Sequence, residues 1–379
     1  MDGDPQSVKV AIAYNTSWYI YIFRMNLIRA LLARGYQVLT ITPRDQYTEK
    51  LEAAGCTHVH VALDSRSKNP LKDLRLTLRY IGLLGKHRPD VLLCYTAKPN
   101  IYATIASWRR RIPVITNIAG LGTGFVRKSL VTRILRFLYG FSQKRASFVF
   151  FQNEDDRRYF TTRRMVRTER CGLLPGSGVD LERFSYDPLR LGAHEDFRFL
   201  LVGRMLYSKG VELLVRAAME ISEGAPRGFV VQLLGDVGVD NEDAIDEQTI
   251  EEWGRHPRIE YLGRTDDVVP RIAESHCVVL PSYYREGTPR SILEGLAVGR
   301  PVITTDMPGC RNTVRHGENG FMIPPRDVQA LSAAMLGMLG QDEESLRAMG
   351  RRSRRLAEET FDEKLVIDSY LTAIERLTR

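Results

Sequence analysis

The sequence predicts an α/β protein with two domains, each a doubly wound parallel sheet. Its 379 residues exceed the length at which one hydrophobic core usually stops growing, although a single β/α barrel would also fit the length alone. Short apolar runs alternate with helical stretches along the chain, and parallel sheets are built from such β-α-β units. A polar stretch rich in proline and glycine interrupts this pattern near its middle.

The first domain is expected over residues 1–175. Its short runs are rich in β-branched or aromatic residues and alternate with helical stretches, which is typical of a Rossmann-like domain. The helix over residues 23–32 has apolar residues at helical spacing and ends at Gly35. The expected strands are residues 8–14, 37–41, 91–95, 114–117 and 148–152.

A second Rossmann-like domain is expected over residues 196–361, after a linker at 176–195 that contains Pro188 and Gly192. Open α/β sheets bind ligands beyond the carboxyl ends of their strands, so the loops that follow the strands should carry the chemistry. The expected strands of this domain are residues 197–202, 229–234, 259–262, 277–280 and 301–304.

Composition excludes several classes of protein. The five cysteines form no C-x-x-C pair, so buried thiols in a reducing compartment are expected rather than disulfides or a zinc site. No D-x-D sequence follows a strand and the seven histidines lack ligand spacing, so no metal is expected. The first residues do not resemble an export signal, and no apolar segment approaches the roughly 18 residues of a membrane span.

The formal net charge of +8 favours an anionic partner. Nucleic acid, a phosphorylated substrate or an acidic membrane face would each satisfy this charge. Nucleic acid is the weakest of the three, because no recognised nucleic-acid-binding motif accompanies the basic residues.

The loop after residues 197–202 contains two cations. Arg204 follows the strand, and Lys209 comes just before a helix that starts at Val211. Cations beside a helix N-terminus suit a diphosphate, because the free N–H groups and the helix dipole already favour anions. An ordinary surface arginine and lysine with solvated heads are the alternative.

The loop after residues 277–280 contains the stronger signal. Glu286 lies in the loop, Thr288 is expected to cap the next helix with Pro289 as its first residue, and Glu294 lies further along that helix. A phosphate could bind the amides near Thr288 and Arg290, while carboxylates accept hydrogen bonds from sugar hydroxyls. Two solvated helix charges are the alternative, but the position after a buried strand favours a binding site.

Arg204 and Lys209 followed by E-x7-E, here Glu286 and Glu294, resemble the signature of family 4 glycosyltransferases. The segments NTSWYIYIFR, YTAKPNIY, TNIAGLGTGF and REGTPRSILE resemble a subgroup that builds lipid-linked glycans. That subgroup includes bacterial N-acetylhexosaminyltransferases acting on undecaprenyl-diphosphate sugars. The resemblance spans nearly the whole chain and implies the GT-B fold, in which two Rossmann-like domains face a central cleft and a C-terminal helix, here residues 362–379, returns to the first domain.

The resemblance also implies a role for each matching residue. Arg204 and Lys209 would grip the donor diphosphate, Glu286 would contact the donor sugar, and Glu294 the ribose hydroxyls. Such enzymes retain anomeric configuration, and the expected catalytic groups, Glu286, Arg204 and Lys209, would act by positioning and electrostatics rather than as a covalent nucleophile. The expected donor-binding residues are Arg204, Lys209, Glu286, Gly287, Thr288, Pro289, Arg290 and Glu294.

Loops of the first domain are the expected acceptor site. Lys98 could meet an acceptor phosphate, and the glycines at 120–124 permit close approach of a ligand, although simple turn chemistry also explains them. Many relatives carry a histidine where this chain has Ala119, so any role of that histidine is absent here or is supplied by another group such as Asn117. The expected acceptor-binding residues are Asn15, Thr16, Ser17, Lys98, Asn100, Asn117, Gly120 and Gly122.

A basic, partly apolar region lies at residues 109–111 and 127–145. It resembles an amphipathic helix on an anionic membrane, although a helix packing its apolar side on the sheet would show the same pattern. The residues concerned are Arg109, Arg110, Arg111, Arg127, Lys128, Arg133, Arg136, Lys144 and Arg145, interleaved with Leu130, Ile134, Leu135, Phe137, Leu138 and Phe141.

We therefore expect a retaining glycosyltransferase that moves an N-acetylhexosamine from a UDP-sugar to a polyprenyl-diphosphate-linked saccharide in surface polysaccharide biosynthesis. UDP-sugar is the expected co-substrate, and neither a cofactor nor a metal is expected. The expected place of action is cytoplasmic, peripheral on the inner face of the membrane. Two alternatives stay open: a UDP-sugar epimerase of the same fold, and a non-catalytic basic binding protein.

Overall fold

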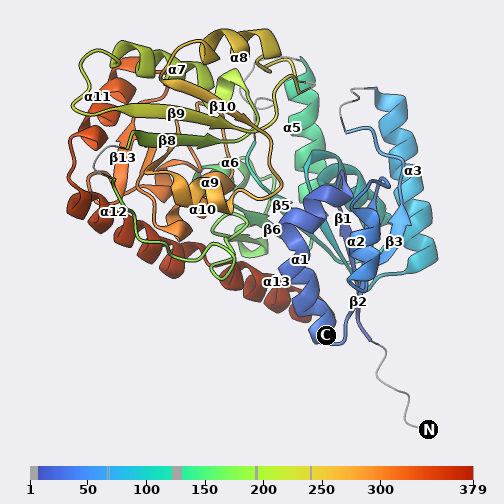
Figure 1. The fold of residues 1–379 in the computed structure, drawn as a ribbon. Helices are drawn as coiled ribbons and strands as arrows, with labels where there is room; N and C mark the ends of the chain where they lie inside the picture. Colours follow the sequence, from blue (N-terminus) through green and yellow to red (C-terminus); the bar gives the residue numbers. More distant parts are fainter. Residues whose placement is uncertain are drawn as a thin grey trace. The chain divides into compact units, whose positions relative to one another are not determined.

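The computed structural model describes residues 7–65, 67, 69–121, 130–192, 195–239 and 241–378. The chain divides into two compact units, each built around one sheet (Figure 1). The first unit consists of Met1–Ser177 together with Lys364–Arg379, and the second of Gly178–Glu363.

The first unit is built on a seven-stranded parallel sheet with the order β3-β2-β1-β4-β5-β6-β7. β1 is central, and its Val10 lies opposite Val38 on one side and Val91 on the other. The order reverses at β1, as in doubly wound folds that bind ligands at this point of the carboxyl edge. The strands are β1 (Lys9–Ala13), β2 (Gln37–Thr42), β3 (Thr57–His60), β4 (Val91–Tyr95), β5 (Val114–Ile118), β6 (Phe148–Phe151) and β7 (Cys171–Leu173).

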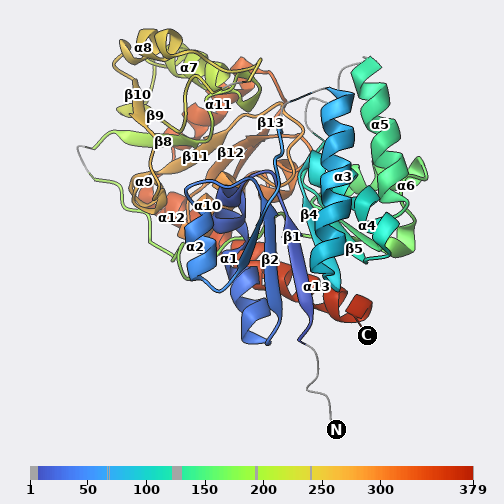
Figure 2. The same ribbon diagram turned by 90° about the vertical axis from the view of Figure 1, so that its right-hand side faces the viewer.

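Helices cover both faces of this sheet. α1 and α13 pack on one face through residues such as Ile28 and Tyr370, and α3, α4 and α5 pack on the other through residues such as Tyr80 and Tyr139 (Figure 2). The helical elements of this unit are α1 (Ser17–Ala33), α2 (Thr48–Ala53), α3 (Pro70–His87), the π-helical turn η1 (Pro99–Ala103), α4 (Thr104–Arg110), α5 (Leu130–Gln143), α6 (Glu154–Thr162), the 3-10 turn η3 (Thr168–Arg170) and α13 (Glu363–Thr378).

The second unit is built on a six-stranded parallel sheet with the order β10-β9-β8-β11-β12-β13. The strands are β8 (Phe197–Val202), β9 (Phe229–Leu234), β10 (Ile259–Gly263), β11 (Cys277–Leu280), β12 (Val302–Thr305) and β13 (Gly320–Ile323). The helical elements are η4 (Tyr207–Lys209), α7 (Val211–Glu220), α8 (Glu247–Gly254), α9 (Val269–Glu274), α10 (Arg290–Val298), η5 (Arg311–Thr313), α11 (Val328–Leu339), α12 (Glu343–Leu356) and η6 (Ala357–Phe361).

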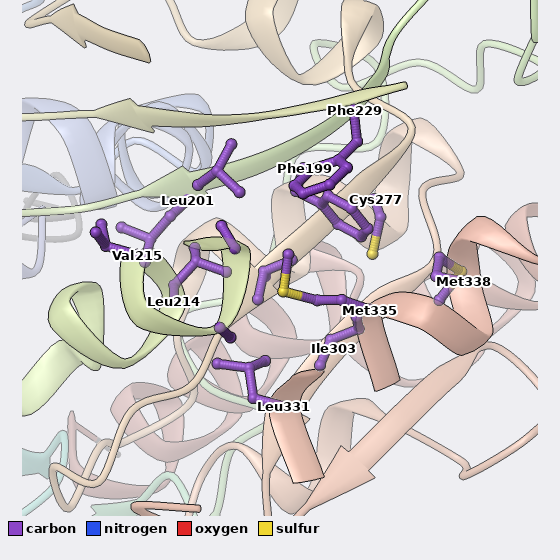
Figure 3. Close-up of a cluster of buried hydrophobic side chains, with 14 of the residues drawn as sticks. Phe199, Leu201, Leu214, Val215, Phe229, Cys277, Ile303, Leu331, Met335 and Met338 are labelled. Carbon is purple, nitrogen blue, oxygen red and sulfur yellow. The ribbon is translucent and has the colours of Figure 1, made fainter. Parts of the chain in front are cut away.

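A separate apolar cluster covers each face of the second sheet. On one face, β8 contributes Phe199 and Leu201, α7 contributes Leu214, and α11 contributes Leu331 and Met335 (Figure 3). Complete burial of side chains of this size stabilises a fold by roughly 1.5–3 kcal/mol each.

The segment expected as a linker packs on the second unit from Gly178 onward. Val179, Phe184 and Leu189 are buried in the apolar clusters of that unit. The backbone N–H of Val179 also donates to the carbonyl of Phe361 at 2.8 Å. The polar composition of this stretch gave no sign of these three buried apolar residues.

All ten expected strands are present, with ends that agree within one residue. Three further strands, β3, β7 and β13, were not expected, and each lies at an edge of its sheet. Central parallel strands are buried on both faces and therefore form continuous apolar runs. An edge strand lacks this requirement, and the alternation T-H-V-H of β3 is too short and too polar to stand out.

His276 shows how tightly the amino edge of the second sheet is packed. It is 2 % exposed, its Nδ1 accepts from the backbone N–H of Arg198 at 2.8 Å, and its Nε2 lies 3.1 Å from the carbonyl of Arg190. The two bonds require the neutral ring, with the proton on Nε2. Burial and the nearby Arg198 guanidinium lower the pKa of His276 to about 4.

This buried histidine should make the stability depend on pH. Between about pH 6.5 and pH 4 the unfolded chain binds a proton at His276 while the folded chain does not, so stability falls as the pH falls through this window. The expected loss is about 2–3 kcal/mol. Denaturant unfolding as a function of pH measures it, and His276→Asn, which keeps an acceptor for Arg198, should flatten the slope. An undiminished slope in this variant would contradict the assignment.

Candidate active site

Lys209 and Glu286 meet at the carboxyl edge of the second sheet. Lys209 ends the turn η4 after β8, and Glu286 lies in the loop after β11. Lys209 Nζ and Glu286 Oε1 are 2.5 Å apart, and the two side chains are only 17 % and 12 % exposed. Two residues far apart in the sequence therefore form one largely buried ion pair, and neither is the solvated surface charge that was the alternative.

The loop that carries Glu286 is tied to the loop that carries Lys209. The Ser208 carbonyl accepts from the backbone N–H groups of Tyr283 at 3.0 Å and Tyr284 at 3.2 Å. The hydroxyl of Ser282 lies 3.2 Å from Glu286 Oε1 and orients that carboxylate. These bonds join the two loops that carry the ion pair.

Glycines let these loops approach one another. Gly210 has φ +79°, and a Cβ there would overlap the carbonyl of Pro281 at the end of β11. Gly309, in the loop after β12, has φ +86°, and a Cβ there would overlap the carbonyl oxygen of Gly287. Both positions therefore need glycine for its positive φ and for its missing side chain.

Glu294 lies on α10 and is 8 % exposed. It accepts from Arg290 Nε, one turn earlier, at 2.8 Å. Burial raises the pKa of Glu294, and the Arg290 guanidinium opposes that rise. The pair places an oriented carboxylate close to the N-terminus of the helix.

The start of α10 differs from the sequence expectation. The helix begins at Arg290 with Pro289 as its N-cap, and the Pro289 side chain forms no capping hydrogen bond. Thr288 is buried one residue before this cap, so the expected cap at Thr288 and the expected first helical residue at Pro289 are each one residue too early. The physical reason is that Pro289 has an extended ψ of 119°, which moves the start of the helix by one residue.

Arg204 is exposed immediately after β8 and Gly203. Within the described part of the chain, no hydrogen bond or ion pair holds its guanidinium. Arg204 can therefore bind an anion directly, whereas Lys209 must first break its ion pair with Glu286.

Taken together, these loops present two cations, the amides at the start of α10 and two carboxylates at one edge of one sheet. Cations and helix N-termini bind phosphate groups, and oriented carboxylates bind hydroxyl groups. Among the residues that the structure describes, no group of three or more His, Cys, Asp or Glu residues could hold a metal ion.

Asn100 and Asn117 of the first unit lie inside a buried network. Both are 1 % exposed. Asn100 Nδ2 donates to the Asn117 carbonyl at 2.7 Å, and Asn117 Nδ2 donates to the hydroxyl of Tyr370 on α13 at 2.7 Å. Asn117 thus links α13 to the sheet, and both side chains are too deeply buried to contact an acceptor in this arrangement.

Lys98 is held by α3. Its Nζ is 2.6 Å from Asp73 Oδ1 and donates to the carbonyl of Ser67 at 2.8 Å. Tyr102 donates to the other oxygen of Asp73 at 2.7 Å. To contact an acceptor phosphate, Lys98 must exchange this carboxylate for the phosphate.

The N-terminus of α1 is already occupied by a carboxylate. Asp45, in the loop after β2, accepts from the backbone N–H groups of Ser17 at 2.8 Å and Trp18 at 3.1 Å. The Thr16 hydroxyl caps the same helix by accepting from the N–H of Tyr19. The amides that could bind an acceptor phosphate are therefore satisfied within the unit.

Residues 22–176 match the model of the glycosyl transferase 4-like domain, and residues 196–341 match the model of glycosyl transferases group 1. The chain is a glycosyltransferase of the family 4 type. The expectation from the sequence motifs is confirmed.

Two curated relatives illustrate the similarity. The transferase is 25 % identical, over 95 % of its length and 96 % of the relative, to the N,N'-diacetylbacillosaminyl-diphospho-undecaprenol alpha-1,3-N-acetylgalactosaminyltransferase of Campylobacter jejuni. It is also 25 % identical to the UDP-Gal:alpha-D-GlcNAc-diphosphoundecaprenol alpha-1,3-galactosyltransferase of Escherichia coli, over 76 % of each chain.

Solved structures agree on the fold. Anabaena Alr3699/HepE in complex with UDP and glucose has a TM-score of 0.79 at 19 % identity, over 97 % of the transferase and 100 % of that chain. Sucrose-phosphate synthase from Thermosynechococcus elongatus has a TM-score of 0.78 at 19 % identity, over 98 % and 99 %. The GT-B fold is therefore confirmed.

Two expected acceptor-side positions of the transferase are glycines. Gly120, after β5, has φ +95°, so only glycine is comfortable there. Gly122 lies outside the described residues. In the loop after β1, Asn15 keeps a buried Oδ1 atom for which the described residues provide no hydrogen-bond donor.

Three residues of the transferase that shape these loops were not expected: Asp45, Asp73 and Ser282. Asp45 accepts a hydrogen bond from the backbone N–H of Ser17, and Asp73 pairs with Lys98, so each binds a residue that was expected to bind the acceptor. Asp45 could have been noticed, because a carboxylate in a loop just after a strand lies at the ligand-binding edge. Ser282 gives no signal in the sequence beyond its position two residues after β11.

A cavity of about 660 Å³ lies in the first unit between β6 and α13. Its lining includes Phe148 at the amino end of β6 and Asp368 and Arg376 on α13. None of the expected site residues contributes to it. It lies away from the carboxyl edge of the sheet, where ligands bind in this class of fold.

Proposed function

We propose that the transferase moves an N-acetylhexosamine, with retention of configuration, from a UDP-sugar to a polyprenyl-diphosphate-linked saccharide in surface polysaccharide biosynthesis. The observation that carries the proposal is the buried pair of Lys209 and Glu286, with Arg204 on the same sheet edge. The two curated relatives, whose names specify acceptors linked to undecaprenyl diphosphate, support the choice of acceptor.

The ion pair suggests how the donor binds. In the absence of donor, Lys209 and Glu286 neutralise one another. The donor diphosphate, which carries more negative charge, replaces the carboxylate as the partner of Lys209, and Arg204 binds it from the exposed side. Glu286, oriented by Ser282, then accepts a hydrogen bond from a hydroxyl of the donor sugar.

Catalysis follows from the same contacts. The bond between the anomeric carbon and the diphosphate oxygen breaks, a new bond forms from that carbon to an acceptor hydroxyl oxygen, and the hydroxyl proton passes to the departing diphosphate oxygen. Negative charge grows on the leaving UDP, and two preorganised cations stabilise it most when the bond has broken. The UDP-sugar is the only co-substrate in this proposal, and no metal or cofactor takes part.

Glu294 is the proposed ligand of the ribose. A carboxylate can accept hydrogen bonds from two neighbouring hydroxyls, and the Arg290 guanidinium orients it and opposes the rise in its pKa that burial causes. This role explains why the chain keeps a buried carboxylate on α10, where an apolar residue would otherwise pack without cost.

Calorimetric titration with UDP, GDP, ADP and NAD tests the donor site. We expect selective binding of UDP that is weakened about tenfold or more in both Arg204→Ala and Glu294→Ala, because each removes a hydrogen bond to or from a charged group. Arg216→Ala, which removes an exposed arginine of α7, is the control and should bind UDP normally. Absence of nucleotide binding, or a preference for NAD, would contradict the proposal.

Analysis of the products decides between transfer and epimerisation. The transferase should convert a UDP-sugar to free UDP only when a polyprenyl-diphosphate-linked acceptor is present, apart from slow hydrolysis. A new epimer formed from the UDP-sugar alone would instead establish an epimerase.

The acceptor implies contact with a membrane, and we propose that the transferase associates peripherally with the inner face of the cytoplasmic membrane. No helix among the described residues is long and apolar enough to cross a bilayer. The expected amphipathic helix is α5, and its Leu130, Ile134 and Phe137 are 69 %, 51 % and 69 % exposed. Arg133 on the same helix is exposed as well, which supports an anionic lipid surface as the partner.

A further inference from the structure

Helix α3 exposes an apolar stripe that nothing in its unit covers. Leu71, Leu74 and Leu78 are 65 %, 57 % and 59 % exposed. Their spacing of three and four residues puts them on one side of the helix. The opposite side is buried through Leu76 and Tyr80. α3 is therefore apolar on two sides, although packing on the sheet requires only one.

The charges beside this stripe are positive. Lys72, Arg75 and Arg79 alternate with the exposed leucines and are themselves exposed. Lys72 pairs with Asp64 at 3.1 Å, whereas Arg75 and Arg79 have no carboxylate partner among the described residues, because Asp73, the only acidic residue in the sequence of α3, binds Lys98 and Tyr102. An apolar stripe flanked by cations is complementary to an anionic lipid surface, whereas a second copy of the same stripe would bring like charges together.

The exposed apolar side chains concentrate on one face of one unit. Of the ten large hydrophobic side chains that are exposed among the described residues, seven belong to α3, α4 and α5. These three helices cover the same face of the first sheet, and α4 contacts both α3 and α5 (Figure 2). The stripe on α3 thus belongs to the same layer as the amphipathic helix α5.

We infer that α3 is a second docking helix of the transferase and that its occupant is the surface of an anionic lipid bilayer. The link to the active site rests on the proposed function: Asp73, in the first turn of α3, binds Lys98 beyond β4 at the carboxyl edge. A bilayer docked on Leu71 and Leu74 lies beside this edge. A lipid-borne acceptor would then reach the loop of Lys98 with its diphosphate still at the membrane surface.

Sedimentation with vesicles tests the stripe. On vesicles of phosphatidylglycerol and phosphatidylcholine, Leu74→Ser/Leu78→Ser should bind at least tenfold more weakly, because two leucines no longer enter the bilayer. The matched control is Leu173→Ser/Leu365→Ser, which changes two leucines that are each 45 % exposed on β7 and α13. This control should bind vesicles normally.

The charge contribution is tested separately. Arg75→Gln should weaken binding to the phosphatidylglycerol vesicles about fivefold and leave the weak binding to pure phosphatidylcholine unchanged. Added salt should reduce the difference between wild type and variant, because it screens the attraction. An equal effect of the substitution on both kinds of vesicle would contradict an anionic occupant.

Two further measurements separate this inference from the proposed function. UDP binding of Leu74→Ser/Leu78→Ser should equal that of wild type, which also shows that the variant is folded. If the wild type does not bind UDP but binds vesicles, and the variant does not bind vesicles, the proposed function is wrong and the docking surface is supported. Unchanged vesicle binding of the variant overturns the inference. If, in addition, the wild type is a dimer and the variant a monomer in analytical ultracentrifugation, the stripe is a contact between copies of the chain.

Discussion

Lys209→Ala should lower kcat for sugar transfer by about 10²- to 10³-fold. The ammonium of Lys209 sits at a fixed position on the sheet edge, held by Glu286 until the diphosphate arrives. Its charge stabilises the leaving UDP most strongly when the glycosidic bond has broken and the UDP is fully charged. Loss of this charge should therefore affect kcat more than KM. Release of UDP in the presence of a lipid-linked acceptor measures both constants.

The same substitution should also destabilise the fold, and a second substitution separates the two effects. Without Lys209 the Glu286 carboxylate is largely buried without its cation, which should cost about 2 kcal/mol of unfolding free energy. Lys209→Ala/Glu286→Gln removes that buried charge and should regain most of the stability while remaining inactive. If the double variant regains activity as well, Lys209 serves only the fold. Arg216→Ala is the control for loss of a cation and should leave both properties unchanged.

Among glycine-to-alanine substitutions in the candidate donor loops, Gly309→Ala should lower the stability most. The new Cβ would overlap the carbonyl oxygen of Gly287, and it would also require an alanine at φ +86°. We expect a loss of about 4 kcal/mol in unfolding free energy, from the backbone strain together with the forced movement of the loop. Because Glu286 and Gly287 are neighbours in that loop, UDP binding should fall as well.

Gly317→Ala is the matched control for this prediction. Gly317 has φ +79°, close to the φ of Gly309, but a Cβ there meets no atom within 4 Å. It should lose only about 1 kcal/mol and keep normal UDP binding. Equal losses in the two variants, measured by denaturant unfolding, would show that backbone conformation alone matters and that the contact between the two loops does not.

The positions of the central strands could be predicted because burial on both faces forces each of them to be a continuous apolar run. β8 and β11, for example, lie at the residues that the sequence indicates. β3 and β13 could not be predicted, because a strand with one free edge is under weaker constraint and its residues resemble those of a loop. The capping of α10 was predicted one residue too early, because the extended conformation of Pro289 depends on the loop before it.

The sequence indicates candidate donor residues but not the full arrangement of their side chains. Arg204, Lys209, Glu286 and Glu294 stand out because each follows a strand end or a helix start. That Lys209 binds Glu286 could not be predicted from the motif, whereas Arg290 and Glu294 lie four residues apart on one helix, a spacing that allows their ion pair. The Lys209–Glu286 pairing depends on which loops the strand order brings together, and β8 and β11 are neighbours in the sheet although they are distant in the chain.

The sequence by itself determined the two parallel sheets, the family and the residues at the donor edge, because these depend on local periodicity and on short motifs. Only the tertiary structure decided what those residues touch. It placed Asp45 on the helix start beside Ser17 and Asp73 on Lys98, and it left the leucines of α3 uncovered. The physical reason is that charge pairing and burial depend on distances between segments far apart in the chain, and local sequence patterns do not contain those distances.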